Sequence, residues 1–535
     1  MSMESTYDYI VVGAGSAGAV VASRLSESGR FRVLLLEAGA RARHIWSTIP
    51  MGVSRLMTDE TVNWRYVSEP DEGSAGRPIA VPRGKMLGGS SAINGMVYVR
   101  GQAQDYDHWA QLGNPGWSYA DVLPLFKRAE TFDGGDDAYR GRSGPLRVTS
   151  AARHEVPLLE RFIEAAQSIG VPYNPDSNGE RQDGVGMTQM TIHRGRRQST
   201  AASYLDPARG RRNLTMLRGA QAETLVLEGR RCTGVRYWAD GRMQEARAGR
   251  EVILAAGAVN SPQLLELSGI GQGDRLRALG VEPRHHLPGV GENLRDHCLS
   301  RVAYLAAARG LTLSHKARGF GLAGEVVRYA LTRGGVLAST VVPLRMYVRL
   351  RPGLDGPDAG ISVTPFRFEV VNNDWRIGER EGFTVTVHPL RPESTGSVHI
   401  ASADPREAPK IRFNYLSAEV DRMTTVAGVR KARELAAAAP LQGVAGEETA
   451  PGAEVQTDEQ ILAWACQTAE SGYHLAGTCK MGQDPMAVVD HRLKVRGIVG
   501  LRVADASIMP TLTSGNTNAP TIMIGEKCAD LVLSA

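Results

Sequence analysis

Two polar residues near the C-terminal end of the chain have side chains suited to proton-transfer chemistry. His474 begins the run 474–482, and Asn518 lies in the run 515–521. A neutral imidazole, with an ordinary pKa of ~6.5, is a suitable general base near neutral pH. An amide can hold a substrate oxygen by a hydrogen bond but cannot take up its proton. Judged by residue type alone, His474 could equally be a structural histidine, and Asn518, among Gly, Asn and Pro, a turn former.

The first forty residues have the pattern of a dinucleotide-binding turn. The apolar run 9–12 predicts a buried strand, the run 13–18 is a complete GxGxxG, and residues 19–25 predict the helix that follows. In such a unit the three glycines permit a tight turn, a close approach to a pyrophosphate, and close packing of helix on strand. A second strand is predicted at 32–37 and ends in Glu37. This residue lies roughly 20 positions after the last glycine, where a carboxylate accepts hydrogen bonds from a ribose diol. The carboxylate disfavours NADP, but the pattern does not distinguish FAD from NAD as the bound dinucleotide. The alternative interpretation of this segment is a glycine-rich turn in another kind of α/β protein.

Length and composition exclude several classes of protein. The chain has 535 residues, of which 42% are hydrophobic and 22% charged, as expected of a globular protein with two or more domains. A net charge of +5 is too dilute to indicate a nucleic-acid partner, and the basic runs 194–197 and 209–212 are expected to be solvated faces or intramolecular pairs. The five cysteines form no CxxC pair, so neither a disulfide scaffold nor a metal site is expected.

The location of the protein is also predicted from what the sequence contains. No run reaches the ~20 apolar residues that a transmembrane helix needs, and the first residues lack the basic and apolar regions of a secretory signal. These features favour a cytoplasmic protein without a transmembrane segment.

Several longer segments resemble the signatures of the glucose–methanol–choline (GMC) family of flavoprotein oxidoreductases. The resemblance extends from residue 8 to residue 530 and is weakest at roughly 306–385, where this family varies with its substrate. The overall pattern is most similar to the choline-dehydrogenase-like and the aryl- or alkyl-alcohol branches. The segments follow one another in family order, at 83–101, 257–271, 289–297, 474–482, 503–510 and 515–521.

The resemblance implies a mixed α/β (α+β) fold of two parts. A Rossmann-like FAD-binding domain is expected from residues 1–155, 210–305 and 460–535. A substrate-binding domain, whose antiparallel sheet covers the flavin, is expected from 156–209 and 306–459. Within these parts, residues 383–388, 396–400 and 411–413 predict strands of that sheet.

One short helix is expected in the second signature. Ser261 is predicted to be its N-cap, Pro262 its first residue, and Gly269 the residue that ends it.

The resemblance also assigns roles to individual residues. His474 is expected to be the general base and Asn518 its partner, which holds the substrate oxygen. Some family members attach FAD covalently through a histidine just before the Asn of the first signature; here that position is Ile93, so non-covalent FAD is expected. The residues expected to contact FAD are Gly13, Gly15, Ser16, Ala17, Gly18, Glu37, Ala38, Trp64, Met86, Gly89, Asn94, Gly95, Met96, Val97, Ala222, Tyr473, Asp505, Ala506 and Thr521.

The reaction implied by the resemblance is the oxidation of a primary alcohol to the aldehyde. The base removes the hydroxyl proton and a hydride passes to flavin N5. A dehydrogenase with a quinone or protein acceptor is favoured narrowly over an oxidase that reduces O2 to H2O2. A flavin-containing hydroxynitrile lyase and a non-enzymatic nucleotide-binding module are remote alternatives. The oligomeric state and the fate of the aldehyde are left open.

The variable region gives the only indication of the substrate. The cation of choline would need a carboxylate there, whereas residues 339–349 offer Arg345 among mostly apolar neighbours. A hydrophobic or aromatic alcohol with a polar or anionic group near Arg345 is therefore expected. The alternative is that Arg345 is simply exposed to solvent.

Overall fold

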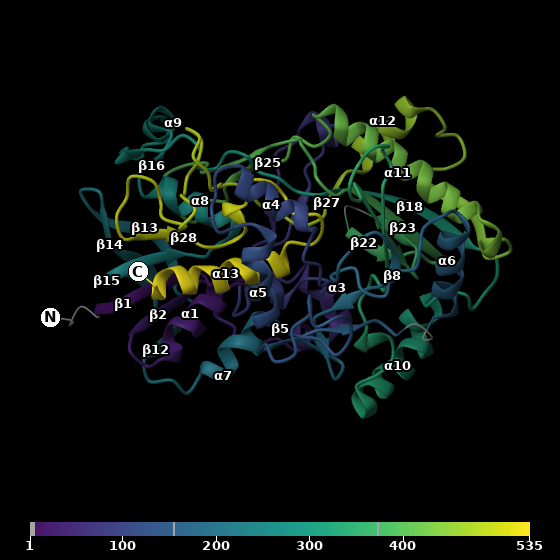
Figure 1. Cartoon of the computed structure of the whole chain (residues 1–535), viewed down its shortest axis with the longest axis horizontal. Helices are drawn as coiled ribbons and strands as arrows, with labels where there is room; N and C mark the ends of the chain where they lie inside the picture. Colours follow the sequence, from purple (N-terminus) through teal and green to yellow (C-terminus); the bar gives the residue numbers. More distant parts are fainter. Residues whose placement is uncertain (1–5, 153–155, 372–373, 535) are drawn as a thin grey trace.

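The computed structural model describes residues 6–152, 156–371 and 374–534. The prediction that the chain has no secretory signal concerns residues most of which lie outside these ranges. Two seven-stranded sheets form within the described chain, and Figure 1 shows them at opposite ends of the molecule. Among the described helices, none is both long and apolar enough to cross a bilayer.

The first sheet is built from both ends of the chain. Its parallel strands are β12 (Leu214–Arg218), β2 (Val33–Glu37), β1 (Thr6–Val12), β15 (Arg242–Leu254) and β28 (Leu501–Val503). The antiparallel strands β13 (Gln221–Glu228) and β14 (Arg231–Ala239) extend it through β15. Parallel strands covered on both faces read as continuous apolar runs, as residues 9–12 and 33–36 do. The predicted strand–turn–helix–strand unit is confirmed.

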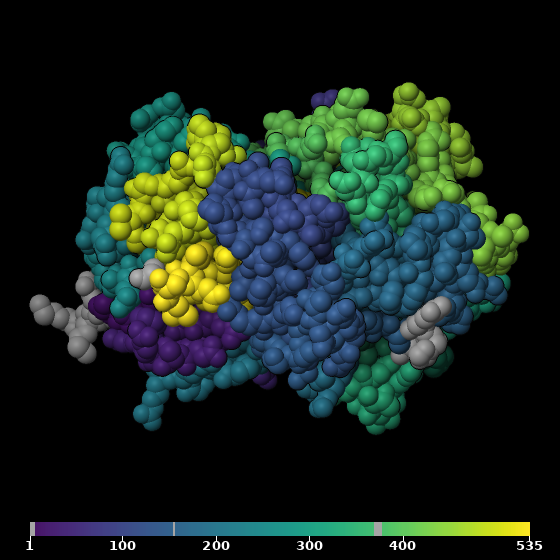
Figure 2. Space-filling model, viewed as in Figure 1, coloured from purple at the N-terminus to yellow at the C-terminus, as the bar shows by residue number. Residues whose placement is uncertain are grey.

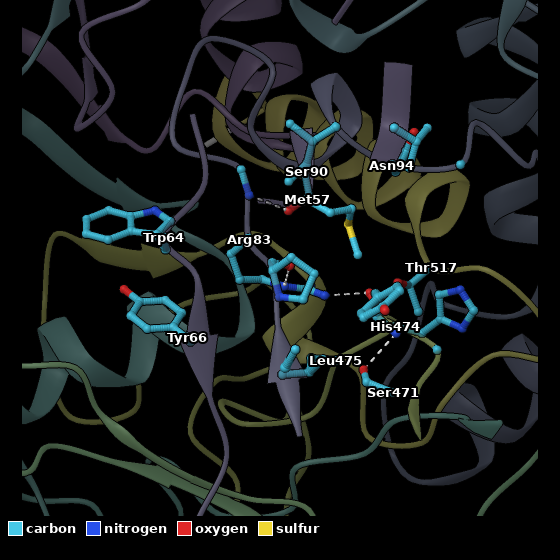
Figure 3. Close-up of a pocket in the computed structure, with 18 of the residues that line it drawn as sticks. Met57, Trp64, Tyr66, Arg83, Ser90, Asn94, Ser471, His474, Leu475 and Thr517 are labelled. Atoms are coloured by element: carbon cyan, nitrogen blue, oxygen red, sulfur yellow. Dashed lines mark hydrogen bonds between the residues drawn. The ribbon is translucent and has the colours of Figure 1, made fainter. Parts of the chain in front are cut away.

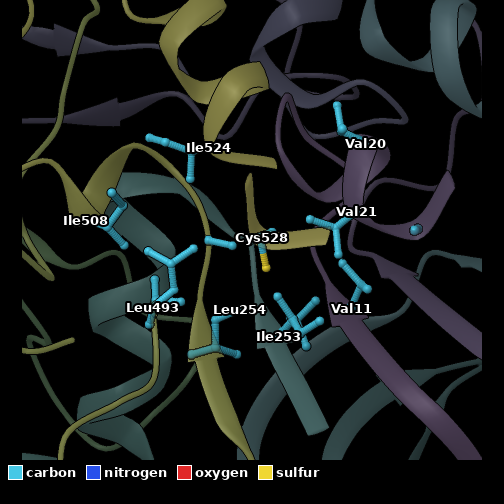
Figure 4. Packing of buried hydrophobic residues seen from close by; sticks show 14 of the residues in the cluster. Val11, Val20, Val21, Ile253, Leu254, Leu493, Ile508, Ile524 and Cys528 are labelled. Atoms are coloured by element: carbon cyan, nitrogen blue, oxygen red, sulfur yellow. The ribbon is translucent and has the colours of Figure 1, made fainter. Parts of the chain in front are cut away.

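The core of this part joins the first helix to the last. Helix α1 (Gly18–Glu27) packs against α13 (Asn518–Leu533) and against the parallel strands. Figure 4 shows Val21 of α1 and Cys528 of α13 packed beside Val11 and Ile253, which are neighbours in the sheet. Burial of such side chains stabilises the fold by about 1.5–3 kcal/mol each. An ion pair of 2.9 Å between the guanidinium of Arg24 and the fully buried carboxylate of Glu526 ties the two helices together.

The second sheet is antiparallel and has one apolar and one polar face. Its strand order is β26 (Ala445–Ala450), β18 (Cys298–Ala306), β23 (Gly382–Pro389), β20 (Ala359–Thr364), β19 (Leu344–Val348) and β8 (Gly184–Met187), and β27 (Glu470–Ser471) also pairs with β18. Because side chains alternate along a strand, residues such as Val302, Val385 and Ile361 point to one face. That face packs against α6 (Pro157–Ser168) and α11 (Glu419–Ala437).

Shorter elements connect and cover the two sheets. The remaining helices are α2 (Ile45–Thr48), α3 (Val53–Leu56), α4 (Ala103–Gln111), α5 (Tyr119–Ala129), α7 (Asp206–Ala208), α8 (Gly257–Leu267), α9 (Gly273–Ala278), α10 (Gly319–Thr332) and α12 (Asp458–Thr468). The two-stranded pairs are β3 (Tyr66–Val67) with β4 (Ala80–Val81), β5 (Glu130–Thr131) with β6 (Leu146–Arg147), β7 (Thr149–Ser150) with β9 (Gln189–Met190), β10 (Ile192–His193) with β11 (Arg196–Arg197), β16 (Ile270–Gly271) with β17 (His285–His286), β21 (Phe368–Val371) with β22 (Asp374–Ile377), and β24 (Ser397–His399) with β25 (Lys410–Arg412).

The start of α8 differs from the prediction. The helix begins at Gly257, so Ser261 is not its N-cap and Pro262 lies inside it. Proline has no N–H for the carbonyl four residues earlier. That carbonyl, of Ala258, instead accepts a hydrogen bond of 2.7 Å from the hydroxyl of Thr478. Gly269, at φ +81°, follows the end of the helix as predicted.

The second sheet also differs in detail from the expected one. The strand predicted at 383–388 is β23 of this sheet, but those predicted at 396–400 and 411–413 form β24 and β25, a separate pair. The predicted division of the chain into two domains stays a prediction. Strand β18, which that division places almost entirely in the FAD-binding part, is hydrogen-bonded into the second sheet.

Candidate active site

A cavity of about 1830 Å³ lies between the two sheets. At one end it is lined by Val12, Leu36 and Ala255, at the carboxyl ends of the parallel strands. The opposite wall is the polar face of the second sheet, with Arg301 and Arg345. Ligands of open α/β sheets bind in the crevice outside the carboxyl ends of the strands. Figure 3 shows Trp64 and Tyr66 on one side of the cavity and His474 on the other.

The glycine turn forms a cradle that fits a pyrophosphate. A Cβ atom at Gly13 would lie 2.5 Å from the carbonyl oxygen of Ala255, and one at Gly89 would lie 2.7 Å from the Cα of Gly15. A Cβ at Gly15 itself would meet no atom closer than 3.9 Å, so the backbone there borders open cavity. This combination of crowding behind the turn and space in front of it is what a bound phosphate group requires.

Glu37 lies at the end of β2, where it lines the cavity. Its carboxylate accepts hydrogen bonds from the backbone N–H groups of Ala14, at 3.0 Å, and Gly39, at 2.8 Å. Burial raises the pKa of Glu37 to about 7, although these bonds act to lower it. Ala38 and Ala222 line the same part of the cavity. This end therefore has the acidic residue and the small side chains expected beside a ribose and an adenine.

The structure places most of the predicted cofactor contacts around one cavity. Gly18 and Met86 do not line it. A Cβ at Gly18 would lie 1.9 Å from the carbonyl oxygen of Gly13, so Gly18 allows α1 to approach the turn, and Met86 is buried in a separate apolar cluster. The predicted contacts that line the cavity are Gly13, Gly15, Ser16, Ala17, Glu37, Ala38, Trp64, Gly89, Asn94, Gly95, Met96, Val97, Ala222, Tyr473, Asp505, Ala506 and Thr521. Together with the glycine cradle, this lining fits a dinucleotide cofactor.

A tightly bonded turn carries His474 into the cavity. The buried carboxylate of Asp296 accepts hydrogen bonds from the backbone N–H of His474, at 2.7 Å, and from the hydroxyl of Ser471, at 2.5 Å. The guanidinium of Arg83 donates to the carbonyl oxygen of Tyr473, at 2.8 Å, as Figure 3 shows. Tyr473 itself has a φ of +63°, which turns the chain sharply before His474. The turn therefore fixes both the backbone and the direction of the imidazole.

The hydrogen bonds of His474 define which of its nitrogens carries the proton. Nε2 of His297 lies 2.9 Å from the carbonyl oxygen of Leu390, which can only accept, so this nitrogen donates. Nδ1 of the neutral His297 ring is then an acceptor, and it lies 2.8 Å from Nδ1 of His474. His474 therefore donates through Nδ1 and keeps a lone pair on Nε2. That lone pair is directed toward the cavity-lining amide of Asn516, so Nε2 is the unprotonated nitrogen that a general base requires.

Burial and neighbouring cations keep the imidazoles of the site neutral. Burial and the neighbouring His297, His388 and Arg345 hold the pKa of His474 well below its usual value. Burial lowers the pKa of His297 to about 4 and that of His388 well below its usual range. All three rings are therefore uncharged at neutral pH, and His474 is able to accept a proton.

The structure corrects the predicted partner of His474. Nδ2 of Asn516, not of Asn518, lies 2.7 Å from Nε2 of His474. The side-chain oxygen of Asn518 accepts a hydrogen bond of 2.7 Å from the hydroxyl of Ser16, at the glycine turn. Asn518 begins α13, whereas Asn516 lies in the loop before it, so the two amides point to different parts of the cavity. Asn516 thus has the position that the prediction gave to Asn518.

Arg345 belongs to a polar row across the second sheet. Strand register aligns Arg301 with Thr386, Thr386 with Ser362, and Ser362 with Arg345, and all four line the cavity. The guanidinium of Arg301 binds the carboxylate of Glu470 at 3.0 Å. Arg345 is 8% exposed, so it is not simply a solvent-exposed residue. Among the described residues its hydrogen-bond partner is the amide oxygen of Asn516 and no ion pair with a carboxylate forms.

Several of these residues were missed by the analysis of the sequence. His297 ends the family-like segment 289–297, which by itself assigned it no role. Nothing in the sequence marked His388, which reaches the cavity because strand β23 pairs with β18 and β20. Both ring nitrogens of His388 are buried without a hydrogen-bond partner. For Asn516 the signal was present in the run 515–521, but it did not distinguish between the two asparagines.

Comparisons with known proteins agree with this geometry. The GMC oxidoreductase N-terminal model matches residues 7–299, and the GMC oxidoreductase C-terminal model matches residues 392–525. Oxygen-dependent choline dehydrogenase of Photobacterium profundum is 43% identical over 99% of this chain and 94% of its own length. The protein of the same name in Brucella ovis is 44% identical over 98% of this chain and 95% of its own length.

Solved structures show the same likeness. Pyridoxine 4-oxidase from Mesorbium loti superposes with a TM-score of 0.90 at 30% identity, and the likeness covers 99% of both chains. Formate oxidase superposes with a TM-score of 0.93 at 25% identity, covering 100% of this chain and 99% of the other. The predicted α/β fold and the predicted family are confirmed, and with them FAD as cofactor and the oxidation of alcohols as the class of reaction. The chain belongs to the GMC oxidoreductase family.

Proposed function

We propose that this protein oxidises a primary alcohol that carries an anionic or strongly polar group, giving the aldehyde, with His474 as general base and Asn516 as its partner. The observation that supports the reaction best is the pairing at one end of the cavity of an unprotonated imidazole nitrogen with an amide N–H group, 2.7 Å apart. The two groups match the needs of an alcohol, whose hydroxyl donates one hydrogen bond and accepts another.

The substrate hydroxyl would replace the direct hydrogen bond between the two side chains, which must move apart from 2.7 Å to admit its oxygen. It would donate its proton to Nε2 of His474, while its oxygen accepts a hydrogen bond from Nδ2 of Asn516. Arg345 holds the amide oxygen of Asn516 and so orients its N–H groups. Gly15, Gly89 and Glu37 would hold the dinucleotide. When bound, FAD supplies the group that accepts the hydride from the alcohol carbon. Ile93 stands where some relatives carry a linking histidine, which supports non-covalent binding.

The charge of the cavity supports an anionic substrate. The carboxylates among its described lining residues are Glu37, Glu470 and Asp505, and each is already engaged in hydrogen bonds or an ion pair. Arg345 is buried beside the base without a carboxylate, and an uncompensated buried cation is costly unless a ligand neutralises it. A carboxylate or phosphate on the substrate would serve this purpose, whereas a quaternary ammonium would be repelled.

The test compares matched alcohols under anaerobic conditions. Flavin bleaching is followed with benzyl alcohol, 4-(hydroxymethyl)benzoate and choline. We expect 4-(hydroxymethyl)benzoate to bind most tightly. Arg345→Gln should weaken the binding of 4-(hydroxymethyl)benzoate about tenfold more than the binding of benzyl alcohol, because both alcohols lose the orientation of Asn516 but only the benzoate loses a charged hydrogen bond. Arg349→Gln is the control, because Arg349 lies on the outside and pairs with Asp183. Bleaching by choline alone would overturn the substrate assignment, and no bleaching by any alcohol would overturn the reaction.

Choline is the second candidate, because the relatives 43% and 44% identical to this chain are named choline dehydrogenases. We retain a dehydrogenase over an oxidase. Admission of air after anaerobic bleaching decides between them, since rapid reoxidation with peroxide would indicate an oxidase. Reduction by any alcohol would exclude the hydroxynitrile lyase and the non-enzymatic nucleotide-binding module.

We further propose that residues 1–155, 210–305 and 460–535 act as the FAD-binding part and residues 156–209 and 306–459 as the substrate-binding part. We also propose a cytoplasmic location, which is supported by the five unpaired cysteines.

A further inference from the structure

Helix α10 (Gly319–Thr332) turns its apolar side away from the protein. Phe320 is 98% exposed, Leu331 80%, Val327 58% and Val326 51%. At 100° per residue, Phe320, Val327 and Leu331 share one stripe, and the small residues Ala323, Gly324 and Ala330 lie within or beside it. Figure 1 shows α10 at the lower right edge of the molecule, and Figure 2 shows this edge projecting from the body.

The side that α10 turns inward is the polar one. Glu325 and Tyr329, one turn apart, are its buried residues. The carboxylate of Glu325 accepts a hydrogen bond of 2.9 Å from the backbone N–H of Val336. The hydroxyl of Tyr329 donates to the carbonyl oxygen of Gly195, at 2.8 Å. These bonds hold the helix in an orientation opposite to that of an ordinary surface helix, whose apolar stripe faces the core. The exposed stripe therefore needs a partner outside the described chain.

Basic residues lie on α10 and in the segments next to it. Between Arg309 and Arg333 the chain carries five Lys or Arg residues and one acidic residue, Glu325. Lys316 and Arg328 lie within 3.9 Å of that single carboxylate, which leaves a clear excess of positive charge. Arg194 and Arg196 are exposed on the β10–β11 hairpin, at whose tip Tyr329 is bound. The run 194–197 was expected to form a solvated face or intramolecular pairs, and the structure places its exposed residues beside α10.

We propose that α10 is an interfacial anchor that docks this protein on the surface of an anionic lipid bilayer. A helix that lies in a membrane interface needs large apolar side chains on one side and Lys or Arg residues at its edges, and α10 with its neighbours has both. A second copy of this chain fits less well, because a two-fold contact through α10 would bring its excess of cations together. The anchor adjoins the cavity, since Arg318, directly before α10, and Val341 and Val342, shortly after it, line the cavity wall.

The test measures binding of the FAD-loaded, full-length protein to vesicles by flotation. Phosphatidylcholine vesicles are compared with phosphatidylcholine vesicles that contain phosphatidylglycerol, at low (about 0.05 M) and high (about 0.5 M) salt. We expect binding to the anionic vesicles that weakens at high salt, and little binding to the neutral ones. Phe320→Ser/Leu331→Ser should weaken binding about tenfold or more, since both side chains would be buried in the interface. The melting temperature of this double variant should equal that of the unaltered protein, because Phe320 and Leu331 are both exposed.

A matched double variant serves as control. Met423→Ser/Val499→Ser removes two apolar residues that are 56% and 59% exposed on other surfaces, and it should bind like the unaltered protein. Three results would overturn the proposal: no binding to anionic vesicles at low salt, equal loss of binding in both double variants, or a dimer in solution that only Phe320→Ser/Leu331→Ser converts to a monomer. Flotation needs no substrate, so its outcome is independent of the proposed reaction.

Discussion

Replacement of His297 by Phe should slow the chemical step, because His297 determines the proton position on His474. The ring of His297 is fully buried, and its Nδ1 is the acceptor for Nδ1–H of His474, at 2.8 Å. Phe keeps the ring but leaves that N–H without a partner. An unpaired buried donor costs about 1–3 kcal/mol. The tautomer with its lone pair toward the cavity would be disfavoured by this amount relative to the inactive one. At 1.36 kcal/mol per factor of ten, the limiting rate should fall about 5- to 150-fold.

The assay is stopped-flow reduction of the bound flavin at saturating alcohol, in the absence of oxygen. His297→Asn offers an amide oxygen close to the original acceptor and should restore the rate to within about threefold. His388→Phe is the control, since this ring packs 5.1 Å from that of His297 but has no hydrogen bond to lose. The reasoning would be refuted if His297→Phe, with an unchanged melting temperature, reduced the flavin as fast as His388→Phe, or if the Asn variant were as slow as the Phe variant.

Three further predictions concern the base, its partner and the cofactor cradle. Asn516→Ala should lower the limiting rate of flavin reduction about a hundredfold, as loss of a donor to the reacting oxygen does. Asn518→Ala should lower the same rate less than about fivefold. Equal effects of the two variants would contradict the assignment of Asn516 as the partner of His474. Because the pKa of His474 is lowered, its proton-accepting form persists as the pH falls. The value of kcat/KM should therefore stay level from about pH 8 to pH 6.5 and decrease only below that range. A decrease that begins above pH 7 would contradict the lowered pKa. Gly89→Ala should abolish retention of FAD, measured as the ratio of flavin to protein absorbance, because its Cβ would clash with the Cα of Gly15 at 2.7 Å. The control is Gly229→Ala, which is also at positive φ but in open space and should retain FAD.

The parts of the site that follow from the sequence are the ones encoded locally. The dinucleotide turn needs strand, glycines, helix and acid within forty residues, so its pattern is complete in one short segment. His474 is likewise marked by the residues next to it. The choice between Asn516 and Asn518 is different, because it depends on where α13 begins. The first turn of that helix directs Asn518 toward Ser16, and the preceding loop leaves Asn516 beside the base.

Residues that reach the site through the pairing of strands could not be assigned from the sequence. His388 and Arg345 belong to different strands, and the register of β19, β20 and β23 determines that both face the cavity. A shift by one residue would turn both side chains to the opposite face of the sheet. The apolar stripe of α10 shows the same limit, since the pattern of residues predicts an amphipathic helix but not which side faces the protein.

The contact between α1 and α13 has a consequence for the synthesis of this protein. The ion pair between Arg24 and Glu526 joins residues separated by 502 positions. At roughly 5–20 residues per second, a ribosome needs on the order of half a minute to two minutes to make the chain between them. During that time the apolar face formed by the strands and helix of the glycine turn is not yet covered by α13. An exposed apolar face of this kind favours chaperone binding. Loading with FAD is therefore expected only after the last helix has left the ribosome, as the final step of folding.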